Sequence, residues 1–240
     1  NWNLPARSPG WCVLRLNPAA EWIRPVRIVR HFMRRHNTMT RPATDVFTEW
    51  AVSNRDAGME LHHAAAVEEM IDAALAVLET RDGFTAIDAG CGNGWTVRRL
   101  CAITGCRAAT GVDGASGMIA QARSLDPRGD YVLADLPTWS PRERVDLVVS
   151  MEVLYYMKDP AGFLRHINAS WLKPGGCAVF GIDHYLENRN SLDWPGELHV
   201  HMTTWPEARW RAALEAAGFT LVRTWRAAAR PGEAGTLAML

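Results

Sequence analysis

The 240-residue chain has no long apolar run and no net charge. No stretch approaches the ~20 consecutive apolar residues of a membrane-spanning helix, so the sequence predicts no membrane span. The 26 Lys and Arg residues balance the 26 Asp and Glu residues, and acids prevail beyond the Arg-rich residues 1–38. Because a nucleic-acid-binding domain usually carries a basic face, this balance argues against a nucleic-acid substrate.

Cysteine is scarce, and its spacing suggests no metal site. The 5 cysteines form no C-x-x-C pair and no Cys/His set at zinc spacing. His199 and His201 alone are weak evidence for a metal ligand set. We therefore expect no metal, and we expect reduced thiols in a cytoplasmic protein.

The chain has one glycine-rich turn after a strand, and it lacks the G-x-x-x-x-G-K-[ST] motif of nucleoside triphosphate sites. The turn lies in residues 85–94, Thr-Ala-Ile-Asp-Ala-Gly-Cys-Gly-Asn-Gly. An apolar run up to Asp88 predicts a buried strand before it, and a helical pattern follows from Trp95. Glycine lets the backbone approach a ligand, and the helix adds unpaired N–H donors. Asp113, ~20 residues further on, is placed to hold two ribose hydroxyls.

Strand and helix patterns alternate from Thr85 onward. Short apolar runs alternating with helical patterns predict a doubly wound, mostly parallel seven-stranded α/β sheet. Only residues 231–235 separate the last two strands, too few for a crossover helix, so the last strand should pair antiparallel. Strands are expected near residues 85–89, 107–112, 130–134, 145–150, 177–183, 220–226 and 236–240, and helices near 45–79, 95–104, 115–125, 160–171 and 205–217.

These patterns resemble the class I (Rossmann-like) S-adenosylmethionine (SAM) dependent methyltransferases over residues 84–240. The segments that carry the resemblance are residues 88–94, 111–119, 134–137, 145–154 and 172–176, in the order of that family. The resemblance implies that SAM is the cofactor and that residues 39–83 form a helical lid. It implies these cofactor-binding residues: Asp88, Gly90, Gly92, Gly94, Asp113, Met118, Asp135, Leu136, Ser150 and Met151.

The acceptor side is predicted from the segment after the fifth strand. His184 titrates in the range of a general base, so we predict that it is catalytic. Residues 186–204 make a long connection that we interpret as a cap over the acceptor. The predicted substrate-binding residues are Tyr155, Tyr156, Tyr185, Glu187, Asn188 and Trp194. By the resemblance, Glu60 and His63 of the lid are reserve catalytic candidates; the alternative is that they are solvated surface groups.

The sequence thus predicts methyl transfer to an N, O or S atom of a small polar or amphipathic molecule. The alternatives are a protein or RNA methyltransferase and a catalytically silent SAM-binding regulatory module. The acceptor and the oligomeric state are not predicted. Residues 1–38 are interpreted as a basic N-terminal extension, either appended to the domain or a transit peptide for organelle import.

Overall fold

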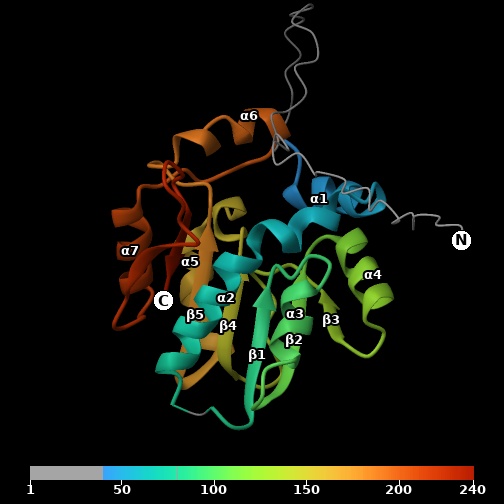
Figure 1. Cartoon of the computed structure of the whole chain (residues 1–240), viewed down its shortest axis with the longest axis vertical. Coiled ribbons are helices and arrows are strands. Elements are labelled where there is room, and N and C mark those ends of the chain that lie inside the picture. Colours follow the sequence, from blue (N-terminus) through green and yellow to red (C-terminus); the bar gives the residue numbers. More distant parts are fainter. Residues whose placement is uncertain (1–39, 80) are drawn as a thin grey trace, which may run out of the picture. The chain divides into compact units, whose positions relative to one another are not determined.

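Seven strands form one sheet in the spatial order β3-β2-β1-β4-β5-β7-β6 (Figure 1). The computed structural model describes residues 40–79 and 81–240, so the extension predicted for residues 1–38 lies outside the described residues. The strands are β1 (Phe84–Ala89), β2 (Cys106–Asp113), β3 (Asp130–Leu133), β4 (Val145–Met151), β5 (Leu172–Ile182), β6 (Thr224–Ala227) and β7 (Thr236–Met239).

The first five strands run parallel, and β7 pairs antiparallel with both β5 and β6. The predicted fold class is confirmed, including the antiparallel last strand. Since parallel strands end at the same edge, the ends of β1, β2, β3 and β4 converge there, where ligands bind in open α/β sheets.

Helices cover both faces of the sheet (Figure 1). Buried side chains of α2 (Met59–Val77), α3 (Trp95–Cys101) and α4 (Ser116–Leu125) share one apolar cluster with Ala86 of β1. Ile87, the next residue along β1, belongs instead to the cluster of α5 (Pro160–His166) and α7 (Glu207–Ala216). Successive side chains of a strand point to opposite faces, so this short apolar strand is buried on both sides.

Before the first strand, the chain is helical as predicted. It forms α1 (Ala43–Val52), the short 3-10 helix η1 (Arg55–Gly58) and α2. The second half of α2 is core, because Met70 and Ala74 are fully buried. Helix α1 lies against α4, where a Cβ on Gly117 would stand 2.7 Å from the carbonyl oxygen of Thr48. None of the helices in residues 40–240 has the length and hydropathy needed to cross a bilayer.

Two strands begin several residues away from their predicted starts, and the long connection after β5 contains helices. β5 begins at Leu172 rather than 177, because Leu172 pairs with Val145 before the register shifts and pairing resumes at Cys177. β6 begins at Thr224 rather than 220, and Leu221 just before it has a positive φ of 58°. The connection 186–204 contains the 3-10 helix η4 (Arg189–Ser191) and the short helix α6 (Trp194–Leu198).

Candidate active site

The glycine turn between β1 and α3 has the backbone that its sequence requires. Gly90, Gly92 and Gly94 all have positive φ, at 83°, 51° and 80°, a region that residues with a Cβ seldom adopt. A Cβ on Gly90 would lie 2.1 Å from a methyl carbon of Val153. Gly92 is less confined, since its nearest neighbours across the turn are Met59 at 3.5 Å and Met118 at 4.0 Å. At Gly92 the turn therefore packs against these two methionines.

Two carboxylates, Asp88 and Asp113, flank the turn. Asp113 accepts hydrogen bonds from the backbone N–H groups of Gly92 (2.9 Å) and Ala115 (2.7 Å). Burial, and to a lesser extent the charge of the nearby Asp113, raises the pKa of Asp88 to about 8. Burial also raises the pKa of Asp113. Two acids that resist ionisation in one place indicate a site that a cation would stabilise.

The other predicted cofactor residues lie at the same edge of the sheet. Met118 and Leu136 are buried, and Asp135 is exposed and accepts a hydrogen bond from the Thr138 hydroxyl. The Ser150 hydroxyl donates to the carbonyl of Ala89 at 2.7 Å, which ties β4 to β1. Their roles toward a cofactor remain predictions.

A small cavity of about 20 Å³ joins the glycine turn to the N-terminal helices and to the end of β4. Its lining residues are Met59, His63, Asp88, Gly90, Cys91, Trp95, Thr96, Met151 and Glu152. His63, a reserve catalytic candidate, thus lies beside the predicted cofactor residues Asp88 and Gly90. Glu60, the other reserve candidate, is exposed on α2.

His63 belongs to a polar cluster that the sequence analysis did not identify. Its Nδ1 lies 3.9 Å from a carboxylate oxygen of Asp183, and burial lowers the pKa of His63 despite that acid. Glu152 accepts hydrogen bonds from the backbone N–H of Asp183 and from the Tyr155 hydroxyl. Burial and the charge of Asp183 raise the pKa of Glu152 well above its usual range.

One signal in the sequence pointed toward this cluster. Glu152 follows directly after β4 and Asp183 directly after β5, so both lie at the carboxyl edge of the sheet. In the structure, Glu152 also has a positive φ of 60°. Such strain in a residue other than glycine often marks a functional position.

His184, the predicted base, is fully buried and has both ring nitrogens engaged. Nδ1 is 2.9 Å from the carbonyl of Ser191, and Nε2 is 2.8 Å from the hydroxyl of Thr204. Its ring packs beside Tyr155 and Trp194. Both ring nitrogens therefore contact the segment that follows β5.

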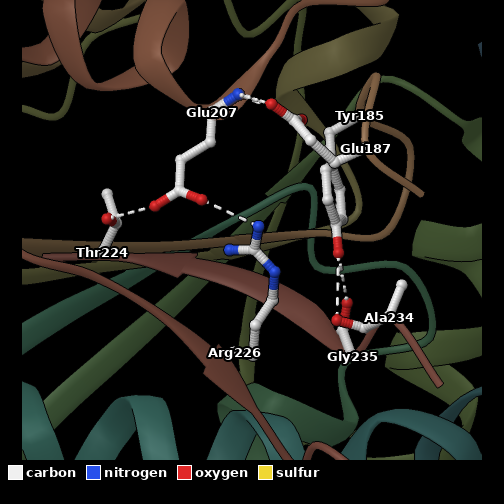
Figure 2. Close-up of polar contacts among 7 residues, drawn as sticks. All are labelled: Tyr185, Glu187, Glu207, Thr224, Arg226, Ala234 and Gly235. Carbon is white, nitrogen blue, oxygen red and sulfur yellow. Dashed lines mark hydrogen bonds and ion pairs between the residues drawn. The ribbon is translucent and has the colours of Figure 1, made fainter. Parts of the chain in front are cut away.

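Two of the predicted substrate residues contact the C-terminal part of the chain (Figure 2). The Tyr185 hydroxyl donates to the carbonyls of Ala234 and Gly235, and the guanidinium of Arg226 lies over its ring. The Glu187 carboxylate accepts from the backbone N–H of Glu207 at the start of α7. Both side chains thus connect the segment after β5 to β6, to the residues before β7 and to α7.

The remaining predicted substrate-binding residues lie either at the polar cluster or beside His184. The Asn188 amide donates to the carbonyl of Asp183 at 2.7 Å and so helps to hold the backbone of the polar cluster. Tyr156 packs on Tyr155 and, edge to face, on Phe47 of α1. Tyr155 and Tyr156 therefore link the polar cluster to the N-terminal helices, while Trp194 packs on His184.

No group of three or more His, Cys, Asp or Glu side chains within residues 40–79 and 81–240 is arranged to hold a metal ion.

Comparison with known proteins identifies the family. A sequence profile described as a methyltransferase domain matches residues 58–224. The chain belongs to this methyltransferase family. The fold is that of the class I SAM-dependent members, and the cofactor expected from the sequence, SAM, is the one that this family uses.

The individual relatives do not specify the function of this chain beyond the family. Trans-aconitate 2-methyltransferase of Klebsiella pneumoniae (strain 342) is 31% identical over 106 residues, which are 44% of this chain and 42% of the relative. The chain spans about half the length of the curated relatives it matches.

Solved structures share the fold. A Haloferax volcanii methyltransferase, solved in complex with the Trm112 methyltransferase activator, is 32% identical with a TM-score of 0.65, covering 75% of this chain and 77% of that one. The DhpI complex with S-adenosylhomocysteine (SAH) is 19% identical with a TM-score of 0.58, covering 82% of this chain and 92% of that one. The second likeness is one of fold alone.

Proposed function

We propose that this protein transfers a methyl group from SAM to an N, O or S atom of a small polar or amphipathic molecule. The observation that carries the proposal is the cavity, which places His63 and Glu152 beside the glycine turn and Asp88. A binding module without catalysis needs the turn alone and has no use for a half-buried histidine beside it.

The residues at the turn suit SAM. When bound, SAM supplies an activated methyl group on a positively charged sulfur. Gly92 has no Cβ between its backbone and the side chains of Met59 and Met118, so this backbone can be approached closely. Asp113 holds the turn through the N–H of Gly92 and also accepts from the N–H of Ala115, outside the turn. A carboxylate has lone pairs left to accept ribose hydroxyls. The raised pKa of Asp88 shows that its charge needs a positive partner, which SAM carries.

On the acceptor side, we propose that His63 takes the proton that the acceptor loses. A lowered pKa keeps the imidazole neutral near pH 7, and only the neutral ring accepts a proton. Asp183, 3.9 Å from Nδ1, orients the ring and stabilises it once protonated. Much of the remaining acceleration in methyl transfer comes from alignment and exclusion of water. Phe47 and Tyr156 supply apolar surface nearby.

Because the lining of the cavity has neither Lys nor Arg, it favours a neutral molecule or an amine over a polyanion as the acceptor. Its lining includes Asp88 and Glu152 but neither Lys nor Arg, and Asp183 lies beside it. A tricarboxylate such as trans-aconitate, the molecule named for the curated relatives, would need cationic partners to replace its hydration. We therefore expect trans-aconitate to be a poor acceptor here.

The test has two parts. Calorimetry should show that SAM and SAH bind and that Asp113→Ala weakens both by roughly 2–4 kcal/mol, as expected for lost hydrogen bonds to a charged group. A screen with methyl-labelled SAM should then find transfer to amines or neutral hydroxyl compounds, with trans-aconitate as the anionic comparison. Binding without turnover on any acceptor class would support the silent module. Preferred methylation of trans-aconitate would contradict the charge argument.

A further inference from the structure

Two acidic side chains of the polar cluster lack a strong cationic partner. Among the residues that the structure describes, neither Glu152 nor Asp183 forms an ion pair with a Lys or an Arg. Oδ2 of Asp183 lies 3.9 Å from Nδ1 of His63, whereas its Oδ1 is buried and has no hydrogen-bond partner in the same part of the chain. The backbone N–H of Asp183 donates to the Glu152 carboxylate at 2.5 Å, which holds the two acids close together. Such a pair is costly to bury without a positive charge nearby.

Aromatic rings continue from these acids to α1. The Tyr155 hydroxyl donates to the Glu152 carboxylate at 2.7 Å and lies 3.4 Å from the Tyr156 hydroxyl. The centroids of the two tyrosine rings are 4.4 Å apart. Phe47 of α1 meets the Tyr156 ring edge to face at 5.3 Å, and the side chains of Phe47 and Tyr156 are only partly buried. Part of this aromatic surface is therefore accessible to a ligand.

Carboxylates without a cationic partner, next to aromatic rings, match a positively charged ligand. The face of an aromatic ring attracts a cation, and a carboxylate forms charge-assisted hydrogen bonds with N–H donors. An alkylammonium group has the charge and three N–H donors. A neutral hydroxyl or thiol group has a single donor, so it leaves the burial of two acids uncompensated.

The same place holds a group that can remove a proton from an ammonium. His63 lines the cavity together with Glu152. The nitrogen of an ammonium group has no lone pair, so it must lose a proton before it can accept a methyl group. An ammonium group bound to Asp183 would lie near the imidazole, because Asp183 and His63 are 3.9 Å apart.

We propose that the methyl acceptor is a primary or secondary amine, which binds in its ammonium form at Glu152, Asp183 and the rings of Phe47 and Tyr156. The inference rests on the proposed function and narrows its acceptor atom to nitrogen. The ammonium gives one proton to His63, and the lone pair freed on nitrogen forms the new C–N bond. The C–S bond of SAM breaks with its electron pair moving to sulfur, which leaves SAH and a methylated ammonium.

Binding to the wild-type protein saturated with SAH tests the need for positive charge. The probes are alkylamines and arylalkylamines such as 2-phenylethylamine, each paired with the alcohol of the same carbon skeleton, such as 2-phenylethanol. In calorimetry, the preferred amine should bind roughly 10- to 100-fold more tightly than its matched alcohol, as expected for hydrogen bonds to charged groups. If no pair shows this preference, the proposal is overturned.

Two variants assign the preference to these residues. Glu152→Gln removes the charge at nearly constant shape, so it should weaken binding of the preferred amine roughly 10- to 100-fold and leave binding of the matched alcohol nearly unchanged. Phe47→Leu keeps an apolar side chain and should weaken binding of the amine alone, by roughly 2- to 5-fold, because the cation loses an aromatic ring. Glu143→Gln, at an exposed position before β4, is the matched control and should change neither affinity.

Unchanged affinity for the amine in both Glu152→Gln and Phe47→Leu would overturn the assignment to this place. If Glu152→Gln does not fold, the wild-type comparison of amine with alcohol and the Phe47→Leu variant still decide the matter.

Turnover separates this inference from the proposed function. With methyl-labelled SAM, amines should be methylated in preference to their matched alcohols and thiols. Preferred transfer to alcohols or thiols would leave the proposed function standing and overturn the amine assignment. If SAH does not bind, or if none of the three classes accepts a methyl group, the proposed function itself fails and this inference fails with it.

Discussion

At the scale of single residues, the two histidines of the candidate site differ in what surrounds them. The ring of His63 lines a cavity and has one acid at 3.9 Å. Both ring nitrogens of His184 lie within hydrogen-bonding distance of oxygens of the same chain. A general base must reach the proton it removes, so position decides between the two before the pKa does.

His63→Asn should lower kcat roughly 10²- to 10⁴-fold and leave the affinity for SAH nearly unchanged. The wild-type rate should rise with pH through a limb below the ordinary histidine pKa of 6.5, because burial lowers the pKa of His63. This limb should be absent from the variant. His184→Asn is the comparison: it should lower the melting temperature, since the carbonyl of Ser191 and the hydroxyl of Thr204 lose a buried partner. A fully active His63→Asn enzyme would contradict the assignment.

At the scale of elements, α1 depends on a close approach to α4. A Cβ on Gly117 would lie 2.7 Å from the carbonyl oxygen of Thr48 and 3.1 Å from its Cα, so a side chain there must push the backbone of α1 away. Through Phe47, α1 also packs on Tyr156 beside the polar cluster. The position of α1 should therefore affect how well the site is closed.

Gly117→Ala should accelerate dissociation of SAH and lower kcat, with a smaller effect on the melting temperature than a core substitution. Stopped-flow fluorescence and steady-state kinetics measure the two rates. Gly196→Ala in α6 is the matched control, because its Cβ would meet nothing within 4 Å. If both variants release SAH at the wild-type rate, the packing of α1 on α4 has no part in retaining the cofactor.

At the same scale, part of the structure could be predicted from the sequence and part could not. The number of strands, the glycine turn and the antiparallel end follow from local patterns: apolar runs, glycines and a short final loop. The polar cluster was missed because it depends on which strand ends become neighbours. Glu152 and Asp183 are 31 residues apart along the chain, and they meet because β4 pairs with β5. The contacts of His184 could not be predicted either, because its partners, Ser191 and Thr204, lie in a connection whose path no local pattern specifies.

At the scale of the whole molecule, the buried acids of the site link stability to pH and to the ligand. The pKa of Asp88 is raised from 3.8 to about 8 by burial, with Asp113 contributing. The folded protein therefore keeps a proton at pH 7 that the unfolded chain has lost. For such a group, stability is fully present below the unfolded pKa and is lost as pH rises through the folded pKa.

The free energy of unfolding should therefore decrease between about pH 7 and about pH 8, above which Asp88 is ionised in both states and contributes no further loss. The pKa values of His63 and His184 are lowered from 6.5, so neither histidine titrates in this window. Asp113 and Glu152, whose pKa values are also raised, act in the same direction as Asp88. SAM carries positive charge and should bind the ionised Asp88 more tightly, so its stabilising effect should grow as the pH rises. Urea unfolding at both pH values, with and without SAM, measures the stability of the free protein and the stabilisation by SAM. Asp88→Asn should show a smaller pH dependence of both quantities. If the wild type and the variant lose stability equally over this range, Asp88 is ionised throughout it, and the charge argument for a cationic ligand at the turn fails.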